Sequence, residues 1–127
     1  MLFGIELIWP QMLISNKINP TALTNNPQKL KGCLDGVFHY QFISISMGEA
    51  HNQLSDKVMK DAQSFTYPLF LLHGAKDTVQ PLDDVKRFFQ LVGSKEKSAL
   101  VFKHGYHQLF QDERAEEQLS TMLVDWI

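Results

Sequence analysis

The strongest constraint on the fold is a pair of short apolar segments, residues 67–74 (YPLFLLHG) and 98–103 (SALVFK), each followed by a loop and a helical pattern. A short continuous apolar run is typical of a strand buried on both faces of a parallel sheet. The segment between them carries apolar residues at the spacing of one helix face: Val85, Phe88, Phe89 and Val92. Gly93 follows, where a helix commonly ends. Strands that alternate with crossover helices predict an α/β fold with a parallel sheet and right-handed connections.

A second helix is predicted at the end of the chain. Asp112 is suited to cap it, and the glutamates that follow complement the positive end of the helix dipole. The predicted buried face of this helix consists of Ala115, Leu119, Met122, Leu123 and Trp126.

The first half of the chain is less regular. Residues 15–36 are rich in Asn, Pro, Lys and Gly and favour a loop with short helical turns. Residues 37–47 are apolar without alternation, so they do not distinguish a strand from a helix. Residues 49–62 fit a helix, and the apolar side chains predicted on one face of it are Leu54, Val58 and Ala62.

Two polar residues stand just beyond the carboxyl ends of the two predicted strands, where α/β sheets gather their functional groups. Asp77 lies in HGAKD after the first strand, and His107 lies in HGYHQL after the second. A carboxylate beside an imidazole fixes its tautomer and stabilises its charged form, which is the acid–base half of a nucleophilic triad. The alternative is that Asp77 is only a turn residue and His107 a surface histidine. Their positions at one edge of neighbouring strands favour the pair.

These segments also carry a resemblance to a known family. YPLFLLHGAKDTVQP, then VFKHGYHQLFQDE and a terminal VDWI, resemble the C-terminal part of the monoacylglycerol lipase-like α/β-hydrolases, also described as lysophospholipase-like or serine aminopeptidase S33-type. The resemblance is dense from about residue 64 onward. It implies that Asp77 is the triad acid and His107 the base, that the substrate is a lipid ester such as a monoacylglycerol, and that no cofactor is needed. It also implies a partial cap or lid and its return segment over residues 1–63, and the C-terminal α/β-hydrolase core over residues 64–127.

The segment FISISMGEA, residues 42–50, is similar to the G-x-S-x-G turn that presents a serine nucleophile, but Ser44 replaces the first glycine. Only thirty residues separate Ser46 from Asp77, where the family inserts another strand, connecting helices and usually a cap. Nothing upstream supplies an oxyanion loop, whose donors are each worth on the order of 3 kcal/mol. We therefore interpret Ser46 as a serine near a helix start, and we expect the nucleophile and the early strands to lie before Met1.

The predicted function is therefore that of a C-terminal fragment of a serine ester hydrolase, inactive without its missing N-terminal part. The alternative is a non-catalytic remnant that associates through the exposed edge of its first strand, because an unpaired apolar edge invites association.

Composition excludes several other classes. The net charge of −2 over 127 residues offers no clustered basic face for nucleic acid. A single cysteine, Cys33, excludes a disulfide framework, and its polar surroundings offer no activation of a thiol. His104 and His107 are two imidazoles without a convincing third ligand from His39 or His51, so we expect no metal site. We expect His73 to pack or hydrogen-bond beneath the Asp77 loop, and Asp83 and Asp84 to begin a helix.

The N-terminal segment MLFGIELIWPQML is apolar. No basic residues precede it and Glu6 interrupts it, so it does not fit a signal peptide. It is too short to span a bilayer, which takes about 20 apolar residues. We predict a buried or half-buried helix; the alternative is a lipid-facing element near a substrate entrance. The expected location is cytoplasmic or peripheral to a membrane, with contact through the cap.

Overall fold

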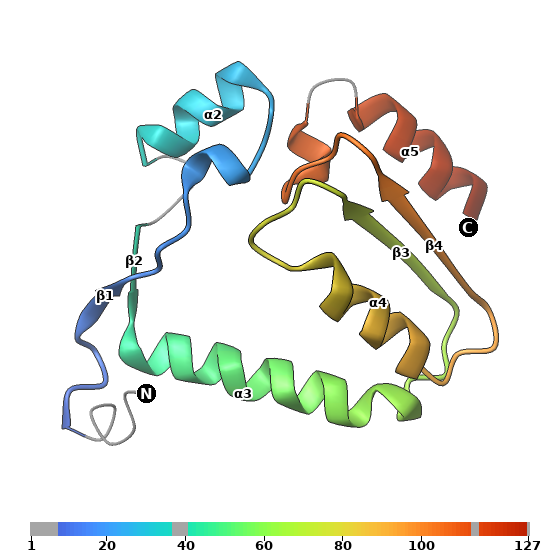
Figure 1. Cartoon of the computed structure of the whole chain (residues 1–127), viewed down its shortest axis with the longest axis horizontal. Coiled ribbons are helices and arrows are strands. Elements are labelled where there is room, and N and C mark those ends of the chain that lie inside the picture. Colours follow the sequence, from blue (N-terminus) through green and yellow to red (C-terminus); the bar gives the residue numbers. More distant parts are fainter. Residues whose placement is uncertain (1–7, 37–40, 113–114, 127) are drawn as a thin grey trace.

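The computed structural model describes residues 8–36, 41–112 and 115–126. Its elements, in chain order, are β1 (Leu13–Ser15), the 3-10 turn η1 (Pro20–Ala22), α2 (Pro27–Leu34), β2 (Phe42–Ser44), α3 (Ile45–Asp61), η2 (Ala62–Ser64), β3 (Leu69–Gly74), α4 (Leu82–Leu91), β4 (Lys97–Phe102), η3 (Leu109–Gln111) and α5 (Ala115–Trp126) (Figure 1).

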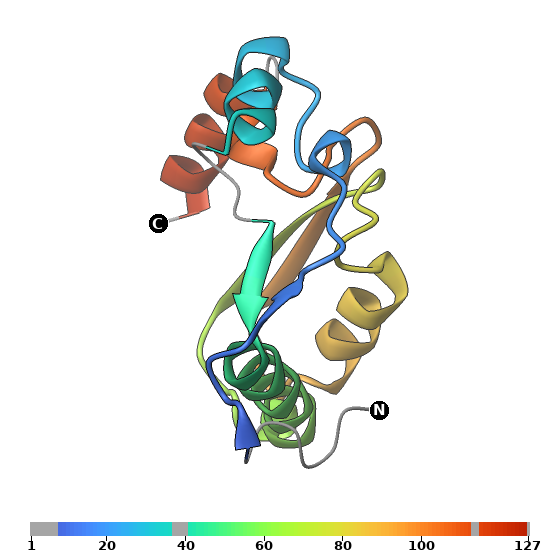
Figure 2. The ribbon, with the colours of Figure 1, turned by 90° about the vertical axis from the view of Figure 1, so that its left-hand side faces the viewer.

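The second half of the chain forms the predicted α/β unit. β3 and β4 pair in parallel, in a register that runs from Leu69 opposite Lys97 to Gly74 opposite Phe102. α4 makes the crossover between them, and α4 and α5 lie on opposite faces of the strand pair (Figures 1 and 2). The end of α5 packs on β3, where the rings of Phe70 and Trp126 stack with centroids 5.1 Å apart. The parallel sheet and its crossover helix are therefore confirmed.

Local sequence explains where α4 begins and ends. Asp83 and Asp84 lie in its first turn, as predicted, where carboxylates complement the helix dipole. At the other end, the ammonium of Lys97 donates to the carbonyl oxygens of Phe89 (2.8 Å) and Val92 (2.9 Å). These carbonyls have no partner within the helix, so Lys97, the first residue of β4, caps the C-terminus of α4.

The first half contains a small antiparallel pair, in which Leu13 lies opposite Ser44 and Ser15 opposite Phe42. β2 continues directly into α3, and the hydroxyl of Ser44 caps this helix by accepting from the backbone N–H of Met47 at 3.1 Å. Within the ambiguous segment 37–47, residues 42–44 are a strand and residues 45–47 belong to α3, which begins four residues earlier than the predicted residue 49. Residues 37–40 lie outside the described part.

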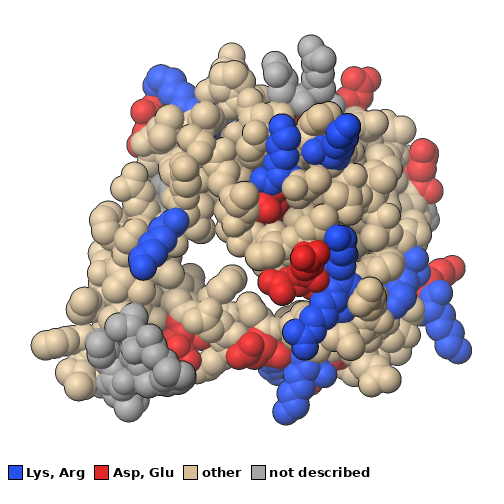
Figure 3. Space-filling view, in the orientation of Figure 1, with Lys and Arg blue, Asp and Glu red and all other residues tan. Residues whose placement is uncertain are grey.

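Several apolar side chains in both halves of the chain are exposed. Leu54 and Val58 on α3 are 60% and 45% exposed, whereas Ala62 is buried. β4, expected to be buried on both faces, leaves Val101 40% exposed. The described part contains two strands in this sheet and one helix on each face, which is too little surface to cover both sides of every strand. Figure 3 shows an opening between the part formed by β1, β2 and α3 and the part that contains β3, β4 and α4.

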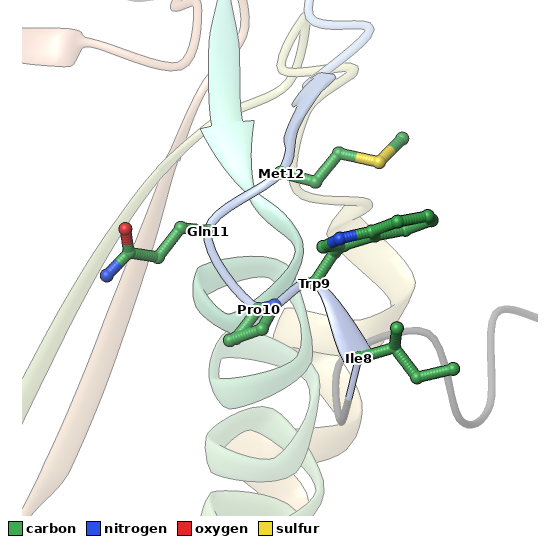
Figure 4. Close-up of a pocket in the computed structure, with 5 residues that line it drawn as sticks. All are labelled: Ile8, Trp9, Pro10, Gln11 and Met12. Atoms are coloured by element: carbon green, nitrogen blue, oxygen red, sulfur yellow. The ribbon is translucent and has the colours of Figure 1, made fainter.

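The prediction of a buried or half-buried N-terminal helix is wrong in its burial for the apolar residues of this segment that the structure describes. The exposed fractions are 69% for Ile8, 65% for Trp9, 50% for Met12 and 64% for Leu13. Residues 8–12 line a pocket of about 570 Å³, and Ile8, Trp9 and Met12 point to the same side of the segment (Figure 4). Residues 1–7 lie outside the described part.

The final helix follows its predicted pattern in part. Leu119 is fully buried, Met122 and Leu123 are half-buried, and Trp126 is 37% exposed. The side chain of Ala115 lies outside the described residues. The carboxylate of Asp112 accepts from the backbone N–H groups of Asn25, 87 residues away, and of Tyr106 in the same loop. Residues 113 and 114, which precede α5, lie outside the described part, so the predicted capping role of Asp112 stays a prediction.

The almost fully buried apolar side chains come from both halves of the chain: Leu23, Cys33, Ile45, Ala62, Val92, Leu109 and Leu119. None of the helices in the described part has the length and apolar content needed to cross a membrane.

Candidate active site

The loops that follow β3 and β4 lie side by side at the carboxyl edge of the sheet. The backbone N–H of Ala75 donates to the carbonyl of Phe102 at 2.8 Å, and that of Lys76 donates to the carbonyl of Gly105 at 2.9 Å. The turn closes on itself through the N–H of Asp77 and the carbonyl of Gly74, at 3.1 Å. These bonds fix the backbone of one loop relative to the other before any side chain is considered.

The two predicted site residues meet across these loops. Nδ1 of His107 lies 2.9 Å from Oδ2 of Asp77, and the carboxylate side chain is only 4% exposed. Oδ1 of Asp77 accepts from the backbone N–H groups of Val79 (2.8 Å) and Gln80 (2.9 Å). Asp77 is therefore a turn residue and a histidine partner at once, one oxygen serving each role, so the two alternatives drawn from the sequence do not exclude each other.

Competing effects set the protonation of Asp77. Burial raises the pKa of its carboxyl, but hydrogen bonds from Gln80, His107 and Val79, and the charge of His107, outweigh burial and hold that pKa below its usual value of 3.8. Asp77 is thus a carboxylate at neutral pH. A carboxylate can only accept a hydrogen bond, so it favours the imidazole tautomer whose Nδ1 carries the proton. In that tautomer Nε2 carries the free lone pair, on a side chain that is 36% exposed.

A second imidazole lies beneath this pair. His73, near the end of β3, is 7% exposed, and its Nε2 is 3.5 Å from Oδ2 of Asp77. Among the described residues neither ring nitrogen of His73 has a hydrogen-bond partner. Of the two roles predicted for His73, packing beneath the Asp77 loop is the one observed.

The lowered pKa of Asp77 predicts a loss of stability in acid. The unfolded chain, with the higher pKa, takes up its proton first as the pH falls, so the contribution of ionised Asp77 is complete above about pH 5 and is lost as the pH falls through the lower folded-state pKa. We expect the free energy of unfolding, measured by chemical denaturation, to fall from pH 5 to pH 3 and to fall less in Asp77→Asn. Identical pH profiles for the two proteins would contradict this assignment.

The glycines at the two strand ends allow the loops to approach. A Cβ built on Gly74 would meet the backbone carbonyl groups of Gly105 and Tyr106, the latter oxygen at 2.5 Å. Gly74→Ala should therefore push the His107 loop outward and lower the free energy of unfolding by about 1–3 kcal/mol. Chemical denaturation measures this change. The matched control is Gly48→Ala in α3, where a Cβ meets only the side chain of Ile43 at 3.4 Å and an alanine should be neutral or stabilising. Equal effects at both positions would show that the close approach of the loops is unimportant.

A pocket of about 360 Å³ lies beside His107. Its lining comes from β3 and the loop after β4: Leu72, His107, Gln108, Leu109, Phe110 and Gln111. The amide oxygens of Gln108 and Gln111 are buried and, within the described part of the chain, have no hydrogen-bond partner. Neither glutamine was predicted from the sequence, although Gln108 directly follows the predicted base and Gln111 ends the same HQLFQ segment.

Ser46 lies away from this site. It occupies the first turn of α3, and its hydroxyl is 3.1 Å from that of the capping Ser44. Lys17 is the one described non-glycine residue with a positive φ, so Ser46 does not have the strained backbone of a nucleophile turn. Figures 1 and 2 show the start of α3 well separated from the loops after β3 and β4. The interpretation of Ser46 as a serine near a helix start is confirmed.

Among the described residues, the other side chains considered from the sequence are not gathered into a site. In the ranges that the structure describes, no three His, Cys, Asp or Glu side chains are placed to hold a metal ion. His51 and His104 are exposed, and His39 lies outside the described residues. Cys33 is fully buried, and burial raises the pKa of its thiol, the opposite of what activates a nucleophile.

Comparison with known proteins gives consistent matches. The family described as serine aminopeptidase, S33, matches residues 1–114. The structure is similar to a crystal structure of Paleococcus ferrophilus monoacylglycerol lipase, with a TM-score of 0.82 and 27% sequence identity, over 96% of this chain and 48% of that one. It is also similar in fold to a soluble variant of monoglyceride lipase from Saccharomyces cerevisiae, with a TM-score of 0.82, 15% identity, and 96% and 43% of the two chains covered.

This chain also matches a small part of a much longer sequence relative. An uncharacterized abhydrolase domain-containing protein of Dictyostelium discoideum is 26% identical over 121 residues, which are 94% of this chain and 13% of that protein. The chain thus spans about half the length of the solved structures that it matches, and a smaller part of this relative.

Proposed function

Because this chain belongs to the serine aminopeptidase S33 family and has the fold of part of an α/β-hydrolase, we propose that it supplies the acid and base of a serine ester hydrolase. The observation that carries the proposal is the 2.9 Å contact between Nδ1 of His107 and the buried Oδ2 of Asp77 at the ends of adjacent parallel strands. The serine nucleophile and the oxyanion donors come from polypeptide outside these residues.

The proposed chemistry follows from the tautomer that Asp77 selects. Nε2 of His107 takes the proton of the serine hydroxyl as its oxygen attacks the ester carbonyl, which forms a tetrahedral intermediate. The carboxylate of Asp77 stabilises the resulting imidazolium. His107 then gives the proton to the leaving alcohol, and the acyl group stays on the serine. Water attacks this acyl-enzyme, again with His107 as the base, and the fatty acid and free serine are released.

The proposed substrate is a lipid ester such as a monoacylglycerol. The support is the 27% identity to a protein named monoacylglycerol lipase. In the same proposal, residues 1–63 are part of a cap and its return segment, and residues 64–127 are the C-terminal core. The exposed Ile8, Trp9 and Met12 fit a cap that meets a lipid surface, because large apolar side chains gathered in one place are typical of interaction sites.

The test compares this chain with the complete enzyme, by which we mean a polypeptide that joins these 127 residues to the rest of the α/β-hydrolase fold. We expect the complete enzyme to release fatty acid from a monoacylglycerol, residues 1–127 alone to release none, and Ser46→Ala to leave the complete enzyme unchanged. Hydrolysis by residues 1–127 alone that is lost in Ser46→Ala would overturn both the proposed division of the site and the interpretation of Ser46.

A second candidate function is association without catalysis. Within the described part of the chain β3 pairs with β4 alone, so its other edge presents unpaired backbone groups. Phe65 and Tyr67, just before this strand, are 39% and 74% exposed. Such an edge pairs readily with another strand. Size-exclusion chromatography of residues 1–127 distinguishes the candidates, since a monomer at high concentration argues against association.

A further inference from the structure

The loop that carries His107 is held by a segment more than eighty residues away in the sequence. We call residues 22–25 together with Asp112 the histidine-loop clamp. Five hydrogen bonds connect these residues to the loop or to each other. They are His107 N to Ala22 O (3.4 Å), Gln108 N to Leu23 O (2.7 Å), Thr24 Oγ1 to Gln111 O (2.9 Å), Asn25 N to Asp112 Oδ1 (2.9 Å) and Tyr106 N to Asp112 Oδ2 (2.6 Å).

The side chains of Thr24 and Asp112 in the clamp are shielded from water. Thr24 is 1% exposed and Asp112 is 5% exposed, and the apolar side chains of Leu23 (4%) and Leu109 (8%) are buried as well. Hydrogen bonds to an ionised carboxylate are stronger than neutral ones, and a buried polar group that loses its partner is costly. Asp112 therefore joins the loop to the distant segment with one oxygen for each.

The clamp acts on both sides of the base. The backbone N–H of Tyr106, before His107, is held by Asp112, and that of Gln108, after it, is held by Leu23. With both neighbours fixed, the backbone of His107 has little freedom to move its ring away from Asp77. The backbone–backbone hydrogen bonds between the two strand-end loops reach Phe102 and Gly105, so the backbone N–H groups of Tyr106 and Gln108 are held by the clamp instead.

We propose that Asp112 and Thr24 are positioning residues for His107, and that residues 22–25, within the proposed cap region, form part of the support of the base. The inference rests on the proposed function of His107 as the base. It assigns to the cap segment a role in the geometry of the proton transfer, because a base displaced by about 1 Å can cost a factor of about 100 in rate.

The test uses Asp112→Asn in the complete enzyme. The amide oxygen of Asn can accept from one of the two backbone N–H groups, while its NH2 group faces the other, so one bond is lost. We expect kcat for a soluble ester to fall about 100-fold with KM within twofold of its original value. The matched control is Asp56→Asn, the same change on the exposed surface of α3, which should leave both constants unchanged.

A second pair of variants separates positioning from folding. Thr24→Val keeps the shape of the side chain but removes the hydroxyl that donates to Gln111 and accepts from the N–H of Asn26. Thr24→Ser keeps that hydroxyl. We expect Thr24→Val to lower kcat and Thr24→Ser to restore it. If Asp112→Asn does not fold, the comparison of Thr24→Val with Thr24→Ser tests whether the clamp positions His107.

A readout other than activity is the NMR signal of the His107 Nδ1 proton, identified by its loss in His107→Ala. We expect it to broaden or disappear in Asp112→Asn and Thr24→Val while thermal unfolding remains cooperative. Folded variants with an unchanged signal and unchanged kcat would overturn the inference. An active His107→Ala enzyme would instead overturn the proposed function, so the two failures are distinguishable.

Discussion

Replacing His107 by alanine in the complete enzyme is expected to lower kcat for a monoacylglycerol by on the order of 10⁴- to 10⁶-fold, with little change in KM. In the proposed mechanism, the imidazole of His107 takes the serine proton and later gives it to the leaving alcohol. Alanine provides neither step, and the remaining activity comes from binding and the oxyanion donors. Steady-state kinetics with a monoacylglycerol and a soluble ester measure the loss.

The control for this variant is in the same loop. His104 is exposed and lies three residues before His107. His104→Ala removes an imidazole of the same kind, and we expect its kcat to stay within about twofold of the original. If His107→Ala keeps its activity, or if His104→Ala loses as much, the assignment of the base is wrong.

Replacing Asp77 by asparagine is expected to lower kcat by on the order of 10⁴-fold while the turn stays intact. The amide oxygen of Asn can still accept from Val79 and Gln80, as Oδ1 of Asp77 does. Its NH2 group then faces Nδ1 of His107, so the imidazole must carry its proton on Nε2 instead. In that tautomer Nε2 cannot accept the serine proton, and the base is disabled without being removed.

The comparison variant Asp77→Ala removes both roles of the carboxylate. It should lose activity to a similar extent and also lower the free energy of unfolding, because the N–H groups of Val79 and Gln80 lose their acceptor. Chemical denaturation and kinetics together separate the two effects. An Asp77→Asn enzyme that keeps its activity would show that Asp77 serves the turn alone.

The sequence predicted the second half of the chain well because the determinants there are local. Two apolar runs and the helix between them carry their own periodicity, and their order implies a parallel sheet. The positions of Asp77 and His107 follow from that topology, since the carboxyl ends of parallel strands share one edge. The structure places the two residues in contact, and their catalytic roles stay a prediction.

The same local reasoning did not predict burial in the first half or the partners of Asp112. Whether Leu54 or Trp9 is covered depends on how many other elements pack against it, and an apolar pattern does not contain that number. Asp112 precedes a helix, so a cap was the nearest local role. Its observed partners, Asn25 and Tyr106, are brought to it by folding.

The sequence by itself therefore determined the parallel strand pair, its crossover helix and the placement of Asp77 and His107 at one edge of the sheet, because these depend on short-range periodicity and on a general rule of sheet topology. Only the tertiary structure decided that Asp77 divides its two oxygens between a turn and His107, and that residues 22–25 hold the histidine loop. Hydrogen bonds between groups far apart in the chain depend on distances of about 3 Å that no local pattern encodes.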